Sequence, residues 1–236
     1  GALDRALERN DACGVATPPD THYELARQCL EAGKPVLVEK PMALKAQHAR
    51  ELVYLAQQKR FILMTDDTFL YHPWTELGHY LRGGHQAKTL EAHWTGPRRP
   101  DLGTPDEGIL WTLGPHPVSL MLKYMGRYPL GVRGTVAPRK ATVVYEFVGG
   151  DEASVFLEWD TPGRERYLWW TSHNGNSGEV DFDAPPVAPE PLANMCKSFL
   201  EKIAKPDPWI DYHGLKVVET LEMTEKVLLH KGRPSL

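Results

Sequence analysis

The sequence predicts an α/β protein in which the second half of a doubly wound parallel sheet is followed by an α+β domain with a largely antiparallel, open sheet. Three short apolar stretches near the N-terminus alternate with amphipathic helical segments, a pattern typical of parallel strands with right-handed crossovers. After about residue 66, strand-like segments follow one another at close spacing, separated by turn signals such as GGD and TPGR. We therefore expect two domains, residues 1–66 and residues 67–236.

The N-terminal part alternates helix and strand. Residues 3–9 have a helical composition, and DACGVATPP indicates a short buried strand that a turn ends. Thr21 and Glu24 stand at the spacing of a capping box, which predicts the start of a helix, and Gly33 marks its C-terminus. PVLVE predicts the second strand, residues 43–58 a second amphipathic helix, and FILMT the third strand.

The remaining residues alternate less regularly, with short strands between helices. The last helix is expected either within the second domain or packed back on the first. In chain order we expect a helix over 73–83 closed by Gly83-Gly84, a strand over 87–95, a helix over 109–125, strands near 131–137, 141–148, 152–160, 165–172 and 178–183, and helices near 191–204 and 213–230.

The composition, with 42% hydrophobic and 25% charged residues among 236, is that of a soluble globular protein. A formal net charge of −4 without basic runs argues against nucleic-acid binding. The apolar runs are far shorter than the roughly 20 residues that span a bilayer, and no signal peptide is visible. The cysteines, Cys13, Cys29 and Cys196, match no metal motif. They fit reduced thiols, so we expect a cytoplasmic protein with no bound metal and no membrane contact.

Three polar residues, Thr17, Glu39 and Lys40, fall at the carboxyl ends of predicted parallel strands, where such sheets bind their ligands. A dinucleotide-binding sheet normally begins with a strand, a glycine-rich turn and a helix whose N-terminus holds the pyrophosphate. The sequence contains no Gly-x-Gly-x-x-Gly and no Gly-x-Gly. We therefore expect the second half of a Rossmann-type domain, without a first βαβ portion of about 60 to 70 residues.

The stretch GVATPPDTHYELARQCLEAGKPVLVEKPMAL resembles the Gfo/Idh/MocA family, named after glucose–fructose oxidoreductase and inositol dehydrogenase. DDTFLYHP and ILWTLGPHPVSLML are similar to the segments that line that family's active site. EPLANMCKSFLEKI and DYHGLKVVETLEMTEK are similar to its C-terminal helices. The matches run in order along essentially the whole chain. The residues that carry the resemblance most directly are Thr17-Pro18, His22, Gly33-Lys34 and Glu39-Lys40-Pro41.

The resemblance implies that Lys40 lies beside the nicotinamide and shuttles the proton that accompanies hydride transfer. An ammonium removed from solvent near a positive nicotinamide has a lowered pKa and can act as a base near neutrality. The alternative is that Glu39 and Lys40 form an ordinary ion pair in a surface turn, and helix capping is the alternative role of Thr17. By the same resemblance, the cofactor, NAD or NADP, touches Thr17, Pro18, His22, Glu39, Lys40 and Pro41.

His116 matches the family histidine that touches the substrate hydroxyl; helix capping or structural burial is the alternative. Four residues upstream, one helical turn away, the family usually carries an aspartate, and this sequence has Thr112. A threonine can hydrogen-bond a sugar, but it supplies no charge. The departure indicates an altered substrate, a weaker proton relay or lost catalysis.

Further substrate candidates are Asp67, Arg98, Arg99 and His213. Asp67 would accept a hydrogen bond near the nicotinamide or substrate, and the arginines of PRRP would meet a phosphate or carboxylate of a nucleotide sugar or acidic sugar. Solvated loops, or a helix start for His213, are the alternatives. The aromatic residues of the later strands favour sheet packing or a subunit interface over sugar stacking: Trp159, Tyr167, Trp169 and Trp170.

We therefore expect an NAD(P)-dependent oxidoreductase of a sugar, nucleotide-sugar or polyol hydroxyl or keto group, incomplete as this chain. The alternative is a non-catalytic family descendant that acts as a sugar-binding or oligomeric scaffold. A parallel sheet without its first half exposes an edge that must be covered. We expect an oligomer, a rearrangement or a partner chain to cover it, and among these a homo-oligomer that forms through the C-terminal sheet.

Overall fold

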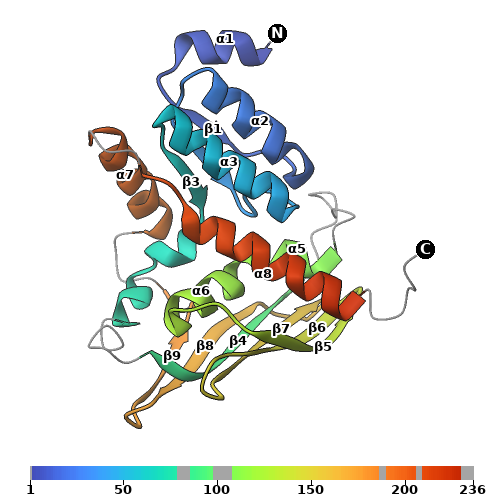
Figure 1. Cartoon of the computed structure of the whole chain (residues 1–236). Helices are drawn as coiled ribbons and strands as arrows, with labels where there is room; N and C mark the ends of the chain where they lie inside the picture. Colours follow the sequence, from blue (N-terminus) through green and yellow to red (C-terminus); the bar gives the residue numbers. More distant parts are fainter. Residues whose placement is uncertain (1, 79–85, 98–107, 186–189, 206–208, 230–236) are drawn as a thin grey trace, which may run out of the picture. The chain divides into compact units, whose positions relative to one another are not determined.

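The computed structural model describes residues 2–78, 86–97, 108–185, 190–205 and 209–229. It forms two compact units: Gly1–Thr68 with Leu192–Glu219, and Phe69–Pro191 with Thr220–Leu236. The first contains a parallel sheet and the second a largely antiparallel sheet, so the predicted fold class is confirmed (Figure 1). The predicted domain boundary near residue 66 stays a prediction.

The first unit is built on three short parallel strands in the order β1-β2-β3, connected by helices α2 and α3. The core of this unit contains strand residues together with Ala26 and Leu30 of α2 and Leu52 of α3. The buried strand residues are Val15, Val36, Val38, Leu63 and Met64. The elements of this unit are α1 (Ala2–Arg9), β1 (Cys13–Val15), α2 (Pro19–Glu31), β2 (Val36–Glu39), α3 (Ala46–Lys59), β3 (Leu63–Asp66), most of α7 (Pro191–Ile203) and the first part of α8 (Tyr212–Leu229).

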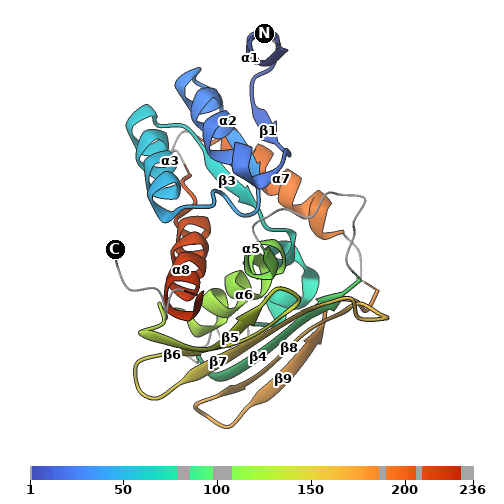
Figure 2. The ribbon, with the colours of Figure 1, turned by 90° about the vertical axis from the view of Figure 1, so that its right-hand side faces the viewer.

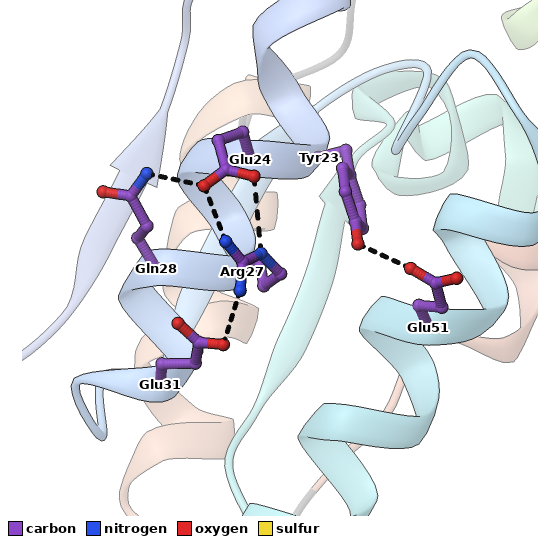
Figure 3. Close-up of polar contacts among 6 residues, drawn as sticks. All are labelled: Tyr23, Glu24, Arg27, Gln28, Glu31 and Glu51. Atoms are coloured by element: carbon purple, nitrogen blue, oxygen red, sulfur yellow. Dashed lines mark hydrogen bonds and ion pairs between the residues drawn. The ribbon is translucent and has the colours of Figure 1, made fainter.

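Helix α2 begins three residues earlier than the capping box predicts, and that prediction is wrong. Pro18 is the N-cap, without a side-chain hydrogen bond, and Pro19 occupies the first turn, where its missing N–H and fixed φ are tolerated. Glu24 therefore lies inside the helix, where it accepts hydrogen bonds from Arg27 and Gln28 on the helix surface (Figure 3).

The C-terminus of α2 agrees with the prediction. Gly33 has a φ of 78°, and the Lys34 N–H bonds to the Cys29 carbonyl at 3.0 Å, as in a Schellman motif. On the neighbouring face, the Tyr23 hydroxyl of α2 donates to Glu51 of α3 at 2.5 Å (Figure 3). These contacts fix the end of α2 and tie its exposed surface to α3.

The segment before α8 pairs with the outer edge of β3. Residue Leu63 forms a parallel bridge with Ile210, and the Asp211 N–H bonds to the Leu63 carbonyl at 3.0 Å. The buried Asp211 carboxylate accepts the Thr65 N–H at 2.9 Å and the Gly214 N–H at 2.8 Å, so it joins β3 to the first turn of α8. A Cβ at Gly214 would collide with the side chains of Thr65 and Asp211.

The second unit is a six-stranded sheet in the order β5-β6-β7-β4-β8-β9, antiparallel except for the parallel pair β4–β7. Figure 2 shows α5 and α6 on one side of this sheet, where both contact β7. The Tyr145 hydroxyl lies 3.0 Å from that of Thr224 in the last turns of α8. The elements are η1 (Thr68–Tyr71), η2 (Pro73–Gly78), β4 (Ala87–Gly96), α5 (Gly108–Leu113), α6 (Pro115–Met125), β5 (Gly131–Ala137), β6 (Lys140–Glu146), β7 (Glu152–Trp159), β8 (Glu165–Ser172) and β9 (Ser177–Asp181).

Two predicted helices differ from the structure. The helix expected over 109–125 is divided at Gly114 into α5 and α6, because Pro115 and Pro117 lack the N–H groups that would continue the hydrogen-bond ladder. The helix expected over 73–83 is replaced by the short 3₁₀ turn η2, and residues 79–85 lie outside the described residues. Over the described part of the chain, no helix is long and apolar enough to cross a membrane.

Candidate functional site

A charged cluster lies at the carboxyl ends of β2 and β3 in the first unit. Glu39 and Asp66 end these strands and face each other in the parallel register. Lys40 and Asp67 follow directly, Lys40 half-buried and Asp67 only 6% exposed. The cluster thus contains one ammonium group and three carboxyl groups, at the edge where parallel sheets bind ligands.

The pKa of Lys40 is lowered from its ordinary value, chiefly because burial disfavours the charged ammonium. The charges of Glu39, Asp67 and Asp66 act in the opposite direction but do not outweigh burial. This lysine therefore releases its proton more readily than a solvent-exposed one. That is the property required of a group that accepts a proton from a hydroxyl.

The pKa of Asp66 is raised to about 7, first by burial and then by the charges of Glu39 and Asp67, against the lowering effect of Lys40. A hydrogen bond between the carboxyl groups of Asp66 and Glu39 adds to this shift. Asp66 therefore holds its proton up to about neutrality. Sequence reasoning missed Asp66, although its position at the last residue of a predicted strand, like that of Glu39, was a usable signal.

His22 joins the loops that follow β1 and β2. Its ring is fully buried, with Nδ1 2.8 Å from the Pro41 carbonyl oxygen and Nε2 2.8 Å from the Thr17 carbonyl oxygen. The two loops that carry the predicted cofactor residues are thereby held together. The predicted contact of His22 with the cofactor stays a prediction, and both ring nitrogens already face backbone oxygens.

The turn before α2 leaves polar groups at the surface. Thr17 and Pro18 are exposed, the hydroxyls of Thr17 and Thr21 lie 2.6 Å apart, and no side chain caps the first turn of α2. A helix N-terminus favours a negative group. This end of the helix therefore suits an anion, and the cofactor contacts predicted for Thr17 and Pro18 stay predictions.

An aromatic cluster lies against one side of His116 in the second unit. The His116 ring, in the first turn of α6, meets the Phe69 ring edge-on at 4.6 Å between centroids. Phe69 also contacts Trp94 of β4 at 5.1 Å and Phe182, after β9, at 5.3 Å. Sequence reasoning selected His116 but not these three rings, which come from three separate segments. Their packing fixes the plane of the imidazole.

Thr112 lies four residues before His116, in α5. Its hydroxyl donates to the Gly108 carbonyl at 2.9 Å, which is a hydrogen bond within its own helix. Position 112 therefore provides a neutral hydroxyl that is hydrogen-bonded to the backbone of its own helix. The catalytic roles predicted for Thr112 and His116 stay predictions.

The other predicted residues have different outcomes. His213 lies half-buried in the first turn of α8, and Arg98 and Arg99 lie outside the described residues. Of the aromatic residues on the strands, Trp170 is buried and Trp169 is 41% exposed, whereas Tyr167 stacks on His93 at 4.3 Å. Among the residues with described side chains, no group of histidine, cysteine, aspartate or glutamate is arranged to hold a metal ion.

Comparison with known proteins adds a family and several relatives. Residues 3–66 match the Gfo/Idh/MocA family model, described as an oxidoreductase family with an NAD-binding Rossmann fold. The chain is 31% identical over 134 residues to UDP-N-acetylglucosamine 3-dehydrogenase of Acidithiobacillus ferrooxidans, a match that covers 56% of this chain and 41% of that enzyme. The chain spans less than half the length of the first curated relatives it matches.

Solved structures share the fold. The crystal structure of the same Acidithiobacillus ferrooxidans enzyme matches 96% of this chain and 81% of its own, at a TM-score of 0.80 and 24% identity. Scyllo-inositol dehydrogenase of Lactobacillus casei, solved with NAD(H) and scyllo-inositol, matches 97% of this chain and 81% of its own, at 0.82 and 11% identity. At these identities the structural likeness shows the fold alone. Together with the family model, it confirms the resemblance that the sequence indicated.

Proposed function

We propose that this protein is an NAD(P)-dependent oxidoreductase, because residues 3–66 match the model of the Gfo/Idh/MocA oxidoreductase family. Its substrate would be the hydroxyl or keto group of a sugar, nucleotide sugar or polyol. The relative named a UDP-N-acetylglucosamine 3-dehydrogenase supports this substrate range.

One observation supports the chemistry more than any other: Lys40, at the end of β2, has a pKa lowered by burial despite three neighbouring carboxyl groups. In the oxidation, the Lys40 Nζ takes the proton of the substrate hydroxyl as the carbon loses its hydride. In the reduction, the same ammonium returns the proton to the oxygen. A positioned base of this kind contributes about 10²-fold to 10⁴-fold to the rate.

A bound NAD or NADP supplies the hydride acceptor or donor. The residues proposed to hold it are the exposed turn of Thr17 and Pro18 before α2 and the Glu39-Lys40-Pro41 turn after β2, with His22 joining the two turns from inside. The uncapped first turn of α2 suits its negative groups.

The remaining residues have roles around the substrate. His116, whose ring is held by Phe69, is proposed to orient the reacting hydroxyl. Thr112 is proposed to contribute a neutral hydrogen-bonding group rather than a charge. Asp67, buried beside Lys40, is proposed as an acceptor near the substrate, and Arg98, Arg99 and His213 as further substrate contacts.

We also propose that the chain forms a homo-oligomer through the six-stranded sheet. One face of this sheet carries a stack of His93 between Phe156, at 4.4 Å, and Tyr167, at 4.3 Å, beside the 41% exposed Trp169. Exposed aromatic groups of this kind are enriched in interfaces. Sedimentation should show an oligomer that Trp169→Lys dissociates; a monomeric unaltered chain would contradict the proposal.

The oxidoreductase proposal is tested by two measurements on the same preparation. Nicotinamide fluorescence during titration of NADH and NADPH should report micromolar binding. Substrate-dependent reduction of NAD⁺ or NADP⁺ should then appear with UDP-N-acetylglucosamine, myo-inositol or a simple hexose. Absence of cofactor binding, or binding without turnover across this panel, would contradict the proposal.

A second candidate is a sugar-binding or oligomeric protein without catalysis. The Thr112 position favours it, because a hydroxyl that donates within its own helix cannot supply the charge of a carboxylate. Sugar binding without any cofactor-dependent turnover would support this candidate and contradict the first.

A further inference from the structure

We propose that Arg166 and Asp183 form a pair that binds two neighbouring hydroxyl groups of the substrate, away from the carbon that reacts. This inference rests on the proposed function, because it assumes that a sugar or polyol substrate binds at His116. Nothing in the comparisons assigns a role to either residue.

The pair is held at the edge of the aromatic cluster. Arg166 lies on β8 opposite Trp94 of β4, and Asp183 follows β9, where the Phe182 N–H bonds to the Arg166 carbonyl at 2.8 Å. The Arg166 Nε donates to Asp183 Oδ1 at 2.8 Å, and Nη2 donates to the same oxygen at 2.5 Å. One carboxylate oxygen therefore fixes the guanidinium.

Phe69 connects this pair to His116. The Arg166 Cζ lies 5.1 Å from the Phe69 ring centre, and the His116 ring centre lies 4.6 Å from the same point. The guanidinium can be no farther from the imidazole than these two distances together. Such a span suits a single sugar or cyclitol ring, with one hydroxyl at His116 and others at the pair.

The two atoms of the pair that remain available for a ligand suit hydroxyl groups. Arg166 Nη1 and Asp183 Oδ2 have no hydrogen-bond partner among the described residues. Nη1 can only donate and a carboxylate oxygen can only accept. Adjacent hydroxyls match this arrangement, because one can accept from Nη1 while the other donates to Oδ2.

A neutral ligand suits the charge of the pair better than an anion. The guanidinium is already neutralised by Asp183, and both side chains are about a quarter exposed, at 24% and 25%. An anion placed on Nη1 would also meet the unpaired oxygen of Asp183. A polyol meets a donor and an acceptor without either cost.

The test is calorimetric titration with myo-inositol, UDP-N-acetylglucosamine and inorganic phosphate, with and without NAD⁺. Arg166→Met and Asp183→Asn should each weaken binding of myo-inositol about tenfold, because each removes a hydrogen bond that involves a charged group. Phosphate binding should be the same in all three proteins. UDP-N-acetylglucosamine should weaken in step with myo-inositol.

Asp183→Asn discriminates between a hydroxyl pair and an anion site. It keeps the shape of the side chain but removes its charge, so it should weaken polyol binding. If the guanidinium instead binds an anion, the same change should strengthen the binding of phosphate or UDP-N-acetylglucosamine, and that result would overturn the proposal.

The matched controls are Arg139→Met and Asp160→Asn, an exposed arginine–aspartate pair at 3.0 Å elsewhere in the same unit. Both should bind the probes as the unaltered chain does. Circular dichroism melting should show that all four variants fold. Polyol binding unchanged by Arg166→Met and Asp183→Asn, or no binding of any probe by the unaltered chain, would also overturn the proposal.

The two proposals fail separately because calorimetry measures binding and not turnover. A chain whose polyol binding depends on Arg166 and Asp183 but which never reduces NAD⁺ would contradict the oxidoreductase and support the pair. A chain that oxidises myo-inositol equally well with Arg166→Met would contradict the pair and support the oxidoreductase.

Discussion

The charged cluster of the first unit and the aromatic cluster of the second have different physical effects on the side chains that they contain. Around Lys40 the protein places three carboxyl groups near one amine and removes them partly from solvent, so that protonation equilibria shift. Around His116 it places apolar rings, with Phe69 at 4.6 Å, so that an imidazole is held in one orientation. The first arrangement prepares a group to exchange a proton, and the second prepares a group to select a geometry.

The two clusters also depend on different structural features. Glu39 and Asp66 meet because parallel register sets the last residues of β2 and β3 opposite each other. Phe69, Trp94 and Phe182 meet only because separate segments pack side by side. Changes in the charged cluster should therefore alter rate and pH dependence, whereas changes in the aromatic cluster should alter substrate binding and local stability.

The largest expected effect is that of Lys40→Met. Removal of the amine should lower kcat about 10²-fold to 10⁴-fold, because the proton acceptor is lost, and this loss should be larger than any change in NADH affinity. Steady-state kinetics and fluorescence titration measure the two quantities. Lys45→Met, which alters an exposed lysine five residues away, is the control. An unaltered kcat in Lys40→Met would contradict the proposal that the charged cluster transfers the proton.

His116→Asn should have the next largest effect. Asparagine retains a hydrogen-bonding group but loses the ring contact with Phe69, so we expect kcat/KM to fall roughly tenfold to a hundredfold, mainly through KM. His173→Asn changes a 53% exposed histidine and should leave the kinetics unaltered. If His116→Asn instead lowered kcat as strongly as Lys40→Met, proton transfer could not be assigned to the charged cluster and substrate orientation to the aromatic cluster.

Asp66→Asn tests the pH dependence of the charged cluster. The folded-state pKa of Asp66 is raised to about 7, so the native state holds this proton more tightly than the unfolded state. The stability that this provides is complete below its ordinary pKa and is lost as pH rises toward 7. The Asp66→Asn variant lacks that loss. Its free energy of unfolding, relative to that of the unaltered chain, should therefore be about 1 to 2 kcal/mol higher at pH 8 than at pH 4, after solvent screening is allowed for.

Urea unfolding at pH 4 and pH 8 measures this difference. Asp20→Asn, which changes an exposed acid in the first turn of α2, is the control and should show no comparable difference between the two pH values. The unfolding free energies of Asp66→Asn and the unaltered chain could instead differ by the same amount at both pH values. That result would show that the pKa of Asp66 is not raised.

Phe69→Leu should have the smallest effect. Leucine keeps an apolar side chain but loses the ring pairs with His116, Trp94 and Phe182, so we expect a loss of about 1 kcal/mol in unfolding free energy and a weaker substrate affinity. Tyr54→Leu, at a 63% exposed position of α3, is the comparison. Denaturant unfolding measures the stability. Equal losses in the two variants would mean that the aromatic contacts have no special part in holding His116.

Sequence patterns predicted the elements well where periodicity and turn residues agree. The strands β5 and β8 have the predicted bounds, and Gly33 closes α2 as expected. The patterns failed where local signals competed: Thr21 and Glu24 had the spacing of a capping box, but Pro19 began the helix first. Pro115 and Pro117 likewise divided a segment whose apolar periodicity was continuous.

The sequence by itself determined the chemistry at the end of β2. The Glu39-Lys40-Pro41 turn, the strand before it and the helix before that are all encoded locally, by residues that are neighbours along the chain. The tertiary structure alone decided which groups meet across the chain: Asp66 opposite Glu39, both nitrogens of His22 on backbone carbonyls, and Arg166 on Asp183. Periodicity specifies which face a side chain occupies, but its partner depends on register and packing between segments, which no local pattern contains.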